Sequence, residues 1–306
     1  MNQYTMHPYT QSFHRIDHIP FDPTSYSCPK DVTPTLNQLT QSCRYTWKGH
    51  TIQFFYAHGD CDQKMRYIAS LLTVLRPEKK LRADILLSPA KKHYPIEPVF
   101  GPPNVNTGYA SDEKVVVYRE EEWLKVFIHE CFHYFHFEEG LMDPSLKPRI
   151  RKRFPVQSEF NLYEAFCEVW ARTLNCYLIS AYTQIPVDIL LEKERKYSMR
   201  HMVNVLAHMG LTYKRIRSPH SEFKEQTNVL AYVVLANILF HGYLDSHPSL
   251  HADGESVVRY IEEHAKDDVF VRAVEHTVPH VTTTMSILSM DDFIPYKGFP
   301  LSLIHI

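Results

Sequence analysis

Residues 120–135 read EEEWLKVFIHECFHYF, and this stretch decides which fold we expect for the chain. Its glutamates come first, where a helix favours negative charge, and Gly140 follows at a position typical of a helix stop. The sequence therefore predicts a helix from about Glu120 to Glu139. Residues four apart lie one above the other on a helix, so His129 and His133 would point the same way and could chelate one metal ion.

Glu130 follows the first of these histidines and lies about 100° further round the helix. From there its carboxylate would reach a water molecule beside the metal without itself binding the metal, which is the position of a catalytic base. The residues around the motif are uncharged, which indicates a buried helix beneath a cleft. The alternative is a buried amphipathic helix with two hydrogen-bonded core histidines and a capped glutamate, since a chain with 19 histidines can contain this pattern by chance.

A zinc hydrolase needs a third protein ligand and one open position. The extended pattern HExxHxxGxxH would require glycine and histidine where this chain has His136 and Glu139, so it is disfavoured. We favour residues 161–171 (NLYEAFCEVWA), which we expect to be helical. Glu164 and Glu168 share one face of that helix, and two carboxylates in an apolar stretch are costly to bury unless a cation lies nearby.

These two glutamates are expected to have different roles at a Zn²⁺ ion. One of them would bind the metal, and the other would accept a hydrogen bond from a ligand histidine and thereby fix its tautomer. Arg172 extends the same face and could neutralise Glu168. The alternative is a solvated acidic stripe that is paired with Arg172.

The motif HECFH followed by an ExxxE helix resembles the gluzincin class of zinc peptidases. This resemblance implies a zincin-like fold, with Glu164 as the third ligand and Glu168 as the carboxylate that supports the first histidine. The chain departs from thermolysin-like enzymes in having glutamate rather than aspartate at position 168 and a longer gap between the two helices. Three segments within residues 84–241 are also similar to little-characterised metallopeptidase-like proteins of large DNA viruses and protists: EEWLKVFIHECFHYF (121–135), YEAFCEVWARTLN (163–175) and TNVLAYVVLANILF (227–240).

The resemblance also implies where a peptide would bind. In this class the strand before the motif helix is an exposed sheet edge that holds extended peptide through its backbone. Val115, Val116 and Val117, in the predicted strand from 114 to 118, occupy that place. A group that stabilises the oxyanion is expected in the helical part, and we favour Tyr232 over the histidines there. The alternative for Tyr232 is an ordinary core tyrosine.

The order of predicted elements indicates an α+β chain, in which a small twisted sheet and the motif helix precede a mainly helical lobe, with zinc between them. Strands are expected at residues 44–47, 51–56, 84–87 and 114–118, loops at 89–108 and 147–153, and further helices at 60–75, 158–180, 187–209, 221–244, 255–266 and 267–275. We divide the chain into an irregular N-terminal arm (1–30), a sheet-containing lobe that ends in the HExxH helix (31–140), a helical lobe with the third ligand (141–300) and a tail of non-native appearance (301–306).

The composition disfavours several classes of protein. Of the 306 residues, 44% are hydrophobic and 22% charged, which is ordinary for a globular chain. The net charge of −2 argues against a nucleic-acid or membrane-surface protein. There is no apolar run of about 18 residues and no secretory signal, so we expect no membrane span. The six cysteines contain no CxxC pair and are expected to be reduced thiols of an intracellular protein, either cytoplasmic or virus-associated.

Together these patterns predict a zinc metallopeptidase that hydrolyses a peptide or protein substrate with a metal-activated water and has no nucleic-acid partner. Two alternatives stay open. The first is a non-catalytic structural or interaction protein that zinc stabilises, although a purely structural site needs no base such as Glu130. The second is a DNA-associated zinc protease, which the lack of a basic domain and of zinc-ribbon cysteines disfavours.

Overall fold

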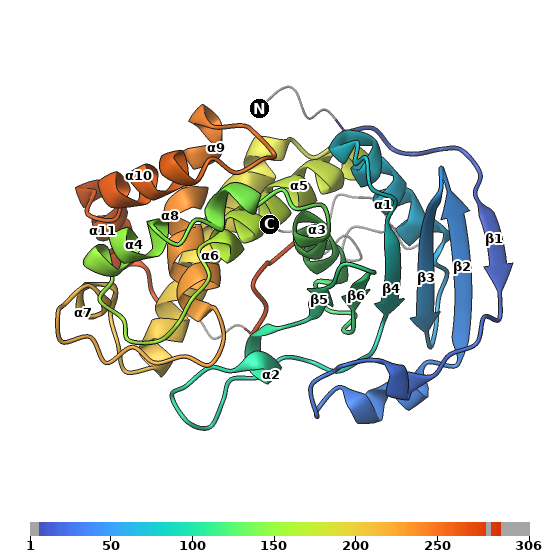
Figure 1. Ribbon diagram of the computed structural model, residues 1–306, viewed down its shortest axis with the longest axis horizontal. Coiled ribbons are helices and arrows are strands. Elements are labelled where there is room, and N and C mark those ends of the chain that lie inside the picture. The colour runs from blue at the N-terminus through green and yellow to red at the C-terminus, as the bar shows by residue number, and fades with distance from the viewer. Residues whose placement is uncertain (1–5, 280–282, 289–306) are drawn as a thin grey trace.

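The computed structural model describes residues 6–279 and 283–288 and shows a mixed α+β chain, as predicted. The strands gather on one side of the molecule and most helices on the other (Figure 1). The predicted tail at 301–306 lies outside the described residues. The strands are β1 (His14–Asp17), β2 (Gln41–Trp47), β3 (His50–Tyr56), β4 (Arg82–Leu86), β5 (Gly108–Ala110) and β6 (Val115–Val117). The α-helices are α1 (Asp62–Leu75), α2 (Pro102–Val105), α3 (Trp123–Tyr134), α4 (Leu146–Arg153), α5 (Tyr163–Thr183), α6 (Val187–His208), α7 (Tyr213–Ile216), α8 (Ala236–Phe240), α9 (Tyr243–Ser246), α10 (Gly254–His264) and α11 (Asp268–His276). Shorter turns are the 3-10 helices η2 (Pro23–Ser25), η3 (Thr33–Gln38) and η4 (Glu139–Leu141) and the π-helical turn η5 (Leu230–Leu235).

The strands of the described residues form one mixed sheet in the order β1-β2-β3-β4-β6-β5. β3, β4 and β6 run parallel, and the other neighbours run antiparallel. Successive side chains of a strand face opposite sides of the sheet. Phe54 and Ile85 therefore join the main core with α1 and α3, whereas Phe55 and Leu86 join a smaller core that Leu36 of η3 covers.

The hairpin of β5 and β6 changes which strand lies at the edge of the sheet. Ser111 N donates to Lys114 O and closes the turn, and β5 then covers the outer side of β6. Val115, Val116 and Val117 are each 0% exposed, because Val115 and Val117 belong to the main core and Val116 belongs to the smaller core. Their strand, β6, lies between β4 and β5. The prediction that this strand is an exposed edge is therefore wrong. The edge strand beside the motif helix is β5. It was not predicted, because the prolines before it indicated a loop that reaches residue 108.

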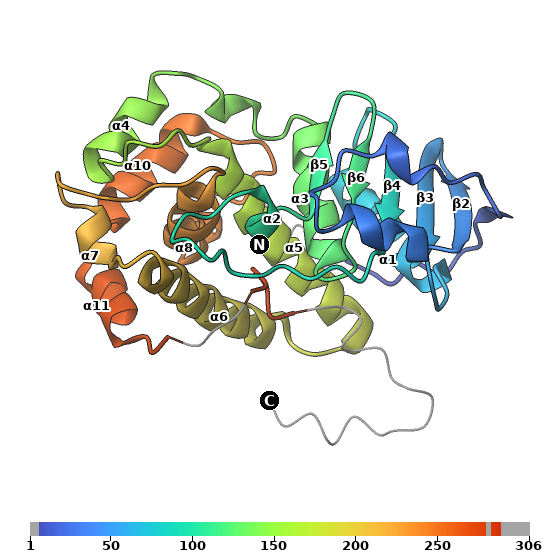
Figure 2. The ribbon, with the colours of Figure 1, turned by 90° about the horizontal axis from the view of Figure 1, so that it is seen from below.

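Helices α3 and α5 join the two parts of the molecule. They pack closely against each other, and α3 also contacts β5 and β6. All residues of α3 except His133 are buried, as the apolar flanks of the motif predicted. Figure 2 shows α3 and α5 between the strands on one side and helices α4, α6, α8, α10 and α11 on the other. The two predicted ligand helices thus meet at the junction of the sheet and the helical part.

Several elements begin or end elsewhere than predicted. Helix α3 ends at Tyr134 because the chain turns at His136, which adopts a left-handed φ of 57° although it is not glycine. Residues 221–244 do not form one helix, since regular structure begins only at η5. The basic run at 147–153 lies in helix α4 rather than in a loop.

The predicted N-terminal arm is also partly regular, because β1 within it pairs with β2. Within the described part of the chain, no helix combines the length and the apolar character that crossing a membrane requires.

Candidate metal centre

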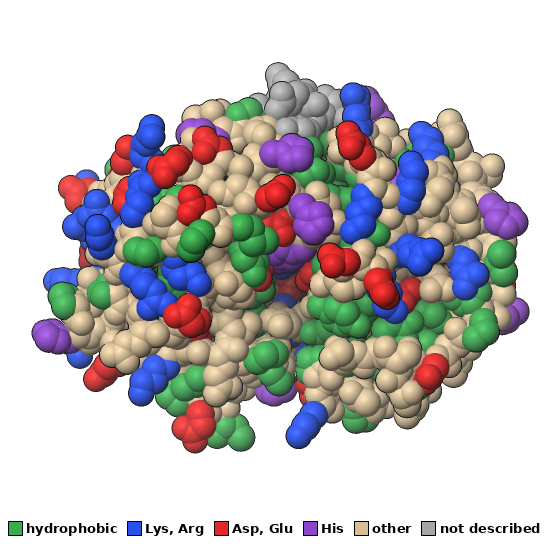
Figure 3. All heavy atoms as spheres, viewed as in Figure 1, with side chains coloured by type: hydrophobic (Ala, Val, Ile, Leu, Met, Phe, Trp, Pro, Cys, Tyr) green, Lys and Arg blue, Asp and Glu red, His purple; other side chains and the backbone are tan. Residues whose placement is uncertain are grey.

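A cleft of about 380 Å³ lies where α3, α5 and the edge strand β5 meet. Figure 3 shows a hollow near the middle of this face, with acidic and histidine side chains around it. Its ionisable and polar lining residues include His129, Glu130, His133, Glu138, Tyr163, Glu164, Glu168, Asn228 and Tyr232, together with Lys125 and Tyr109.

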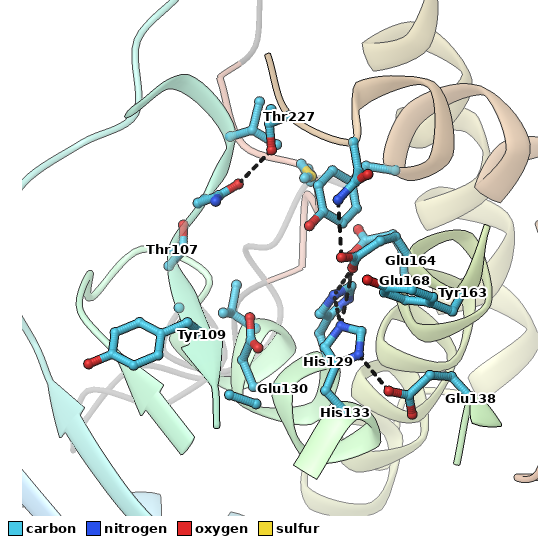
Figure 4. Close-up of a pocket in the computed structure, with 18 of the residues that line it drawn as sticks. Thr107, Tyr109, His129, Glu130, His133, Glu138, Tyr163, Glu164, Glu168 and Thr227 are labelled. Atoms are coloured by element: carbon cyan, nitrogen blue, oxygen red, sulfur yellow. Dashed lines mark hydrogen bonds and ion pairs between the residues drawn. The ribbon is translucent and has the colours of Figure 1, made fainter. Parts of the chain in front are cut away.

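Three donor atoms from the two motif helices converge in this cleft. His129 Nε2 lies 3.0 Å and His133 Nε2 lies 3.1 Å from the same oxygen, Glu164 Oε2. The two Nε2 atoms are 3.1 Å apart. Figure 4 shows these side chains pointing toward one another from α3 and α5. The structure thus brings together the three residues that the sequence predicted as metal ligands.

The triangle of donor atoms fits a zinc ion in size and chemistry. Bonds of about 2.0–2.1 Å to nitrogen and oxygen place the donors of a tetrahedral zinc site about 3.3 Å apart. The observed separations of 3.0 to 3.1 Å are close to that spacing. Two imidazoles and one carboxylate are also a common ligand set of catalytic zinc, which keeps a further position open.

Glu164 is held as a carboxylate. Burial alone would raise its pKa, but the hydrogen bonds with His129 and His133 outweigh burial and lower the pKa to about 2. Asn228 Nδ2 donates to Glu164 Oε1 at 3.2 Å, while Oε2 faces the histidines. Glu164 therefore offers a fixed negative charge at neutral pH to a cation that these three residues could hold. No pattern in the sequence indicates Asn228, which lies far along the chain from Glu164.

Each of the two histidines has a second carboxylate behind it. His133 Nδ1 is 3.0 Å from Glu138 Oε1, which favours a proton on Nδ1 and a free lone pair on Nε2. His129 Nδ1 lies 3.3 Å from Glu168 Oε2, although its N–H is not aligned for a full hydrogen bond. Glu168 thus lies beside His129, and the supporting role predicted for it stays a prediction. Glu138 was not predicted, because the turn at residue 136 carries it back toward His133.

Cys167 forms a second group of possible ligands with His133 and Glu138. Its Sγ lies 3.8 Å from His133 Nδ1. Burial raises the pKa of the Cys167 thiol to about 12, so the sulfur keeps its proton. The Nε2 atom of the same imidazole faces the first group, so we assign Glu138 and Cys167 to the support of His133.

Two buried cations hold Glu168 in place. Lys125 Nζ lies 3.1 Å from both carboxylate oxygens, and Arg172 Nε donates to Oε1 at 2.8 Å. Burial alone would raise the pKa of Glu168, but Lys125 and Arg172 keep that pKa well below its ordinary value. The predicted contact with Arg172 is confirmed. The contact of Lys125 with Glu168 was not predicted; Lys125 lies one helical turn before His129.

Glu130 lies in the cleft beside the three ligands and does not belong to their group. Figure 4 shows its carboxylate between the histidines and the strand that carries Tyr109. Burial raises the pKa of Glu130, although His129 and His133 act in the opposite direction. A raised pKa suits a group that must take up and return a proton near neutral pH.

Tyr232 also lines the cleft, and the centre of its ring lies 5.7 Å from that of His129. It belongs to the π-helical turn η5, and such turns occur frequently at functional sites. The other candidates in the helical part do not line the cleft: His201, His208, His220 and His241.

Comparisons with protein families, with characterised proteins and with solved structures find no match to this chain. The resemblance to gluzincins therefore stays a prediction, and a function must be argued from the geometry of the site.

Proposed function

We propose that this protein is a zinc-dependent peptidase that uses Glu130 as its catalytic base. The observation that carries the proposal is the triangle of His129, His133 and Glu164 with an uncoordinated, buried carboxylate beside it. A purely structural zinc site needs neither such a carboxylate nor a cleft that reaches the ligands. Both features are present here.

The chemistry divides between the metal and the protein. A zinc ion held by these three residues would lower the pKa of a water molecule and polarise the carbonyl group of the substrate. Glu130 takes a proton from the attacking water while the water oxygen forms a bond to the carbonyl carbon. When the carbon–nitrogen bond breaks, Glu130 returns that proton to the leaving amine. The Tyr232 hydroxyl donates a hydrogen bond to the carbonyl oxygen, where negative charge develops.

The edge strand β5 supports a peptide as the substrate. Tyr118 N donates to Thr107 O, and Ser111 N donates to Lys114 O across the hairpin. Hydrogen-bonded and non-bonded residues alternate along an antiparallel pair. The backbone N–H and C=O groups of Gly108 and Ala110 therefore point away from β6, toward the open edge. An extended peptide could pair with them as an added strand beside Glu130.

The substrate would be a peptide or a protein, and we expect the enzyme to be intracellular. None of the six cysteines forms a disulfide, and five of them are buried. Such free thiols are typical of a reducing compartment.

Metal analysis combined with a peptide-cleavage assay tests the proposal. The purified protein should hold about one zinc per chain, and chelation should abolish cleavage. Glu130→Gln should keep the zinc and the fold but lose at least about 100-fold in turnover, because only the base is removed. A Glu130→Gln protein that keeps more than about a tenth of wild-type turnover would show that Glu130 is not the base. Full zinc content in both His129→Ala and His133→Ala would refute the metal site.

A further inference from the structure

Met285 separates the metal cleft from a second, smaller hollow. Met285 and Val105 line both spaces, and they are 5% and 8% exposed. The hollow behind them measures about 10 Å³, which is close to the room that one water molecule needs. Its other walls are largely aromatic and aliphatic, and they include Phe100, Val205 and Val233.

Met285 is held in place by the backbone on either side of it. Ser286 N donates to Glu122 Oε1 at 2.6 Å, and Ile287 N donates to Glu194 Oε2 at 3.2 Å. Tyr197 donates to Thr284 O at 3.2 Å. A short segment far from the ligand helices in sequence thus carries a buried thioether to the side of the cleft.

Met285 and Val105 give this side of the cleft an apolar surface, since both also line the hollow behind it. The one lysine of the cleft lining, Lys125, is already bound to Glu168. An apolar surface favours an apolar side chain of the bound ligand.

From these observations we propose that Met285 forms the floor of a subsite for one apolar side chain next to the scissile bond, and that it sets the depth of this subsite. The proposal rests on the proposed peptidase function. With Met285 in place, the subsite accepts a side chain of leucine size. With a shorter residue at 285, the subsite opens into the hollow behind it and accepts a benzyl group.

Binding of two zinc-directed hydroxamates tests this inference without requiring catalysis. One carries an isobutyl group and the other a benzyl group at the same position, and calorimetry measures the affinity of each for the zinc-loaded protein. Met285→Ala should raise the ratio of benzyl to isobutyl affinity at least about 10-fold, because a methylene-sized change in an apolar pocket discriminates by about 10–200-fold. Met285→Phe should act in the opposite direction and weaken binding of both ligands.

Met142 supplies a matched control. It lines the same cleft but is 53% exposed, so it lies at the rim. Met142→Ala should leave the affinity ratio within about twofold of the wild type. An equal change of ratio in the Met142 and Met285 variants, no change in either Met285 variant, or no binding by the wild type would overturn the inference. Selective binding without any peptide cleavage would instead overturn the proposed function and leave the subsite intact.

Discussion

Replacing Glu164 and Glu168 by glutamine, one at a time, should damage the protein in two different ways. The two residues are one helical turn apart on α5 and both are buried. Glu164 faces two imidazole nitrogens, whereas Glu168 faces Lys125 and Arg172. We therefore expect one carboxylate to be needed for the proposed metal, and the other to be needed mainly for the stability of the folded chain.

The cost of Glu168→Gln follows from the charges that it leaves behind. Lys125 and Arg172 have side chains that are 3% and 1% exposed, so water cannot replace the lost carboxylate. Removing one partner of a buried ion pair costs about 3–5 kcal/mol. For a chain of 306 residues that lowers the melting temperature of the metal-free protein by roughly 5–8 °C. Zinc affinity should fall by only about 10–100-fold, since His129 can still bind.

Glu164→Gln should show the reverse pattern. An amide in place of Glu164 can still form hydrogen bonds with the histidines, so the metal-free protein should lose only about 1 kcal/mol. The amide is a much weaker zinc ligand than the carboxylate, so zinc affinity should fall by more than the about 10–100-fold expected of a supporting residue.

Thermal unfolding in excess chelator and competitive zinc titration, on the same preparations, measure the two effects separately. Glu192→Gln is a suitable control. Glu192 pairs with Lys196 at the same four-residue spacing, but their side chains are 56% and 66% exposed, so a change below about 0.5 kcal/mol is expected. If Glu168→Gln loses more zinc and Glu164→Gln loses more stability, the two assignments are reversed. If neither variant loses zinc, the third ligand lies elsewhere.

Two further substitutions test the edge strand and a buried acid. Gly108→Ala should raise KM for peptides and leave the zinc content unchanged. A Cβ atom at residue 108 would lie 2.7 Å from Val116 O, so β5 would have to shift. An unchanged KM would show that β5 does not bind the substrate. Burial raises the pKa of Glu194 to about 7, so the folded state retains a proton that the unfolded chain releases above pH 4.5. The contribution of this bound proton to the stability of the folded state is fully present below about pH 4.5 and is lost as the pH rises through 7. At pH 8 the free energy of unfolding of Glu194→Gln, measured by denaturant titration, should therefore exceed that of the wild type by about 3 kcal/mol. This difference should disappear by pH 5. A difference that does not change with pH would contradict the raised pKa of Glu194.

The parts of the site that depend on helical spacing could be predicted from the sequence. His129, Glu130 and His133 follow from one turn of helix, and Glu164 and Glu168 follow from the cost of burying two carboxylates in an apolar stretch. The edge strand could not be predicted in this way. β5 is only three residues long and follows a proline-rich loop, so no alternation of polar and apolar residues reveals it.

The residues that contact Glu164 and His133 from outside the two motifs could not be predicted for a different reason. Asn228 and Glu138 reach the site through tertiary packing and through a left-handed turn at His136, and neither belongs to a periodic pattern. Met285 is likewise brought to the cleft by backbone hydrogen bonds to Glu122 and Glu194 beside it. Contacts of this kind depend on the whole fold, so a single sequence without its structure does not contain an identifiable signal for them.

The charge of Glu168 links the stability of the fold to the chemistry of the site. A carboxylate that supported His129 with no other partner would be buried without compensation, and it would become neutral by binding a proton. A neutral Glu168 would no longer favour a proton on His129 Nδ1, and the proposed metal ligand would lose this support. Lys125 and Arg172 prevent this outcome by keeping the carboxylate ionised. Under the proposed function, burying these cations therefore serves the site as well as the fold: Lys125 joins α3 to α5 through Glu168, Arg172 holds Glu168 from within α5, and the carboxylate lies beside His129.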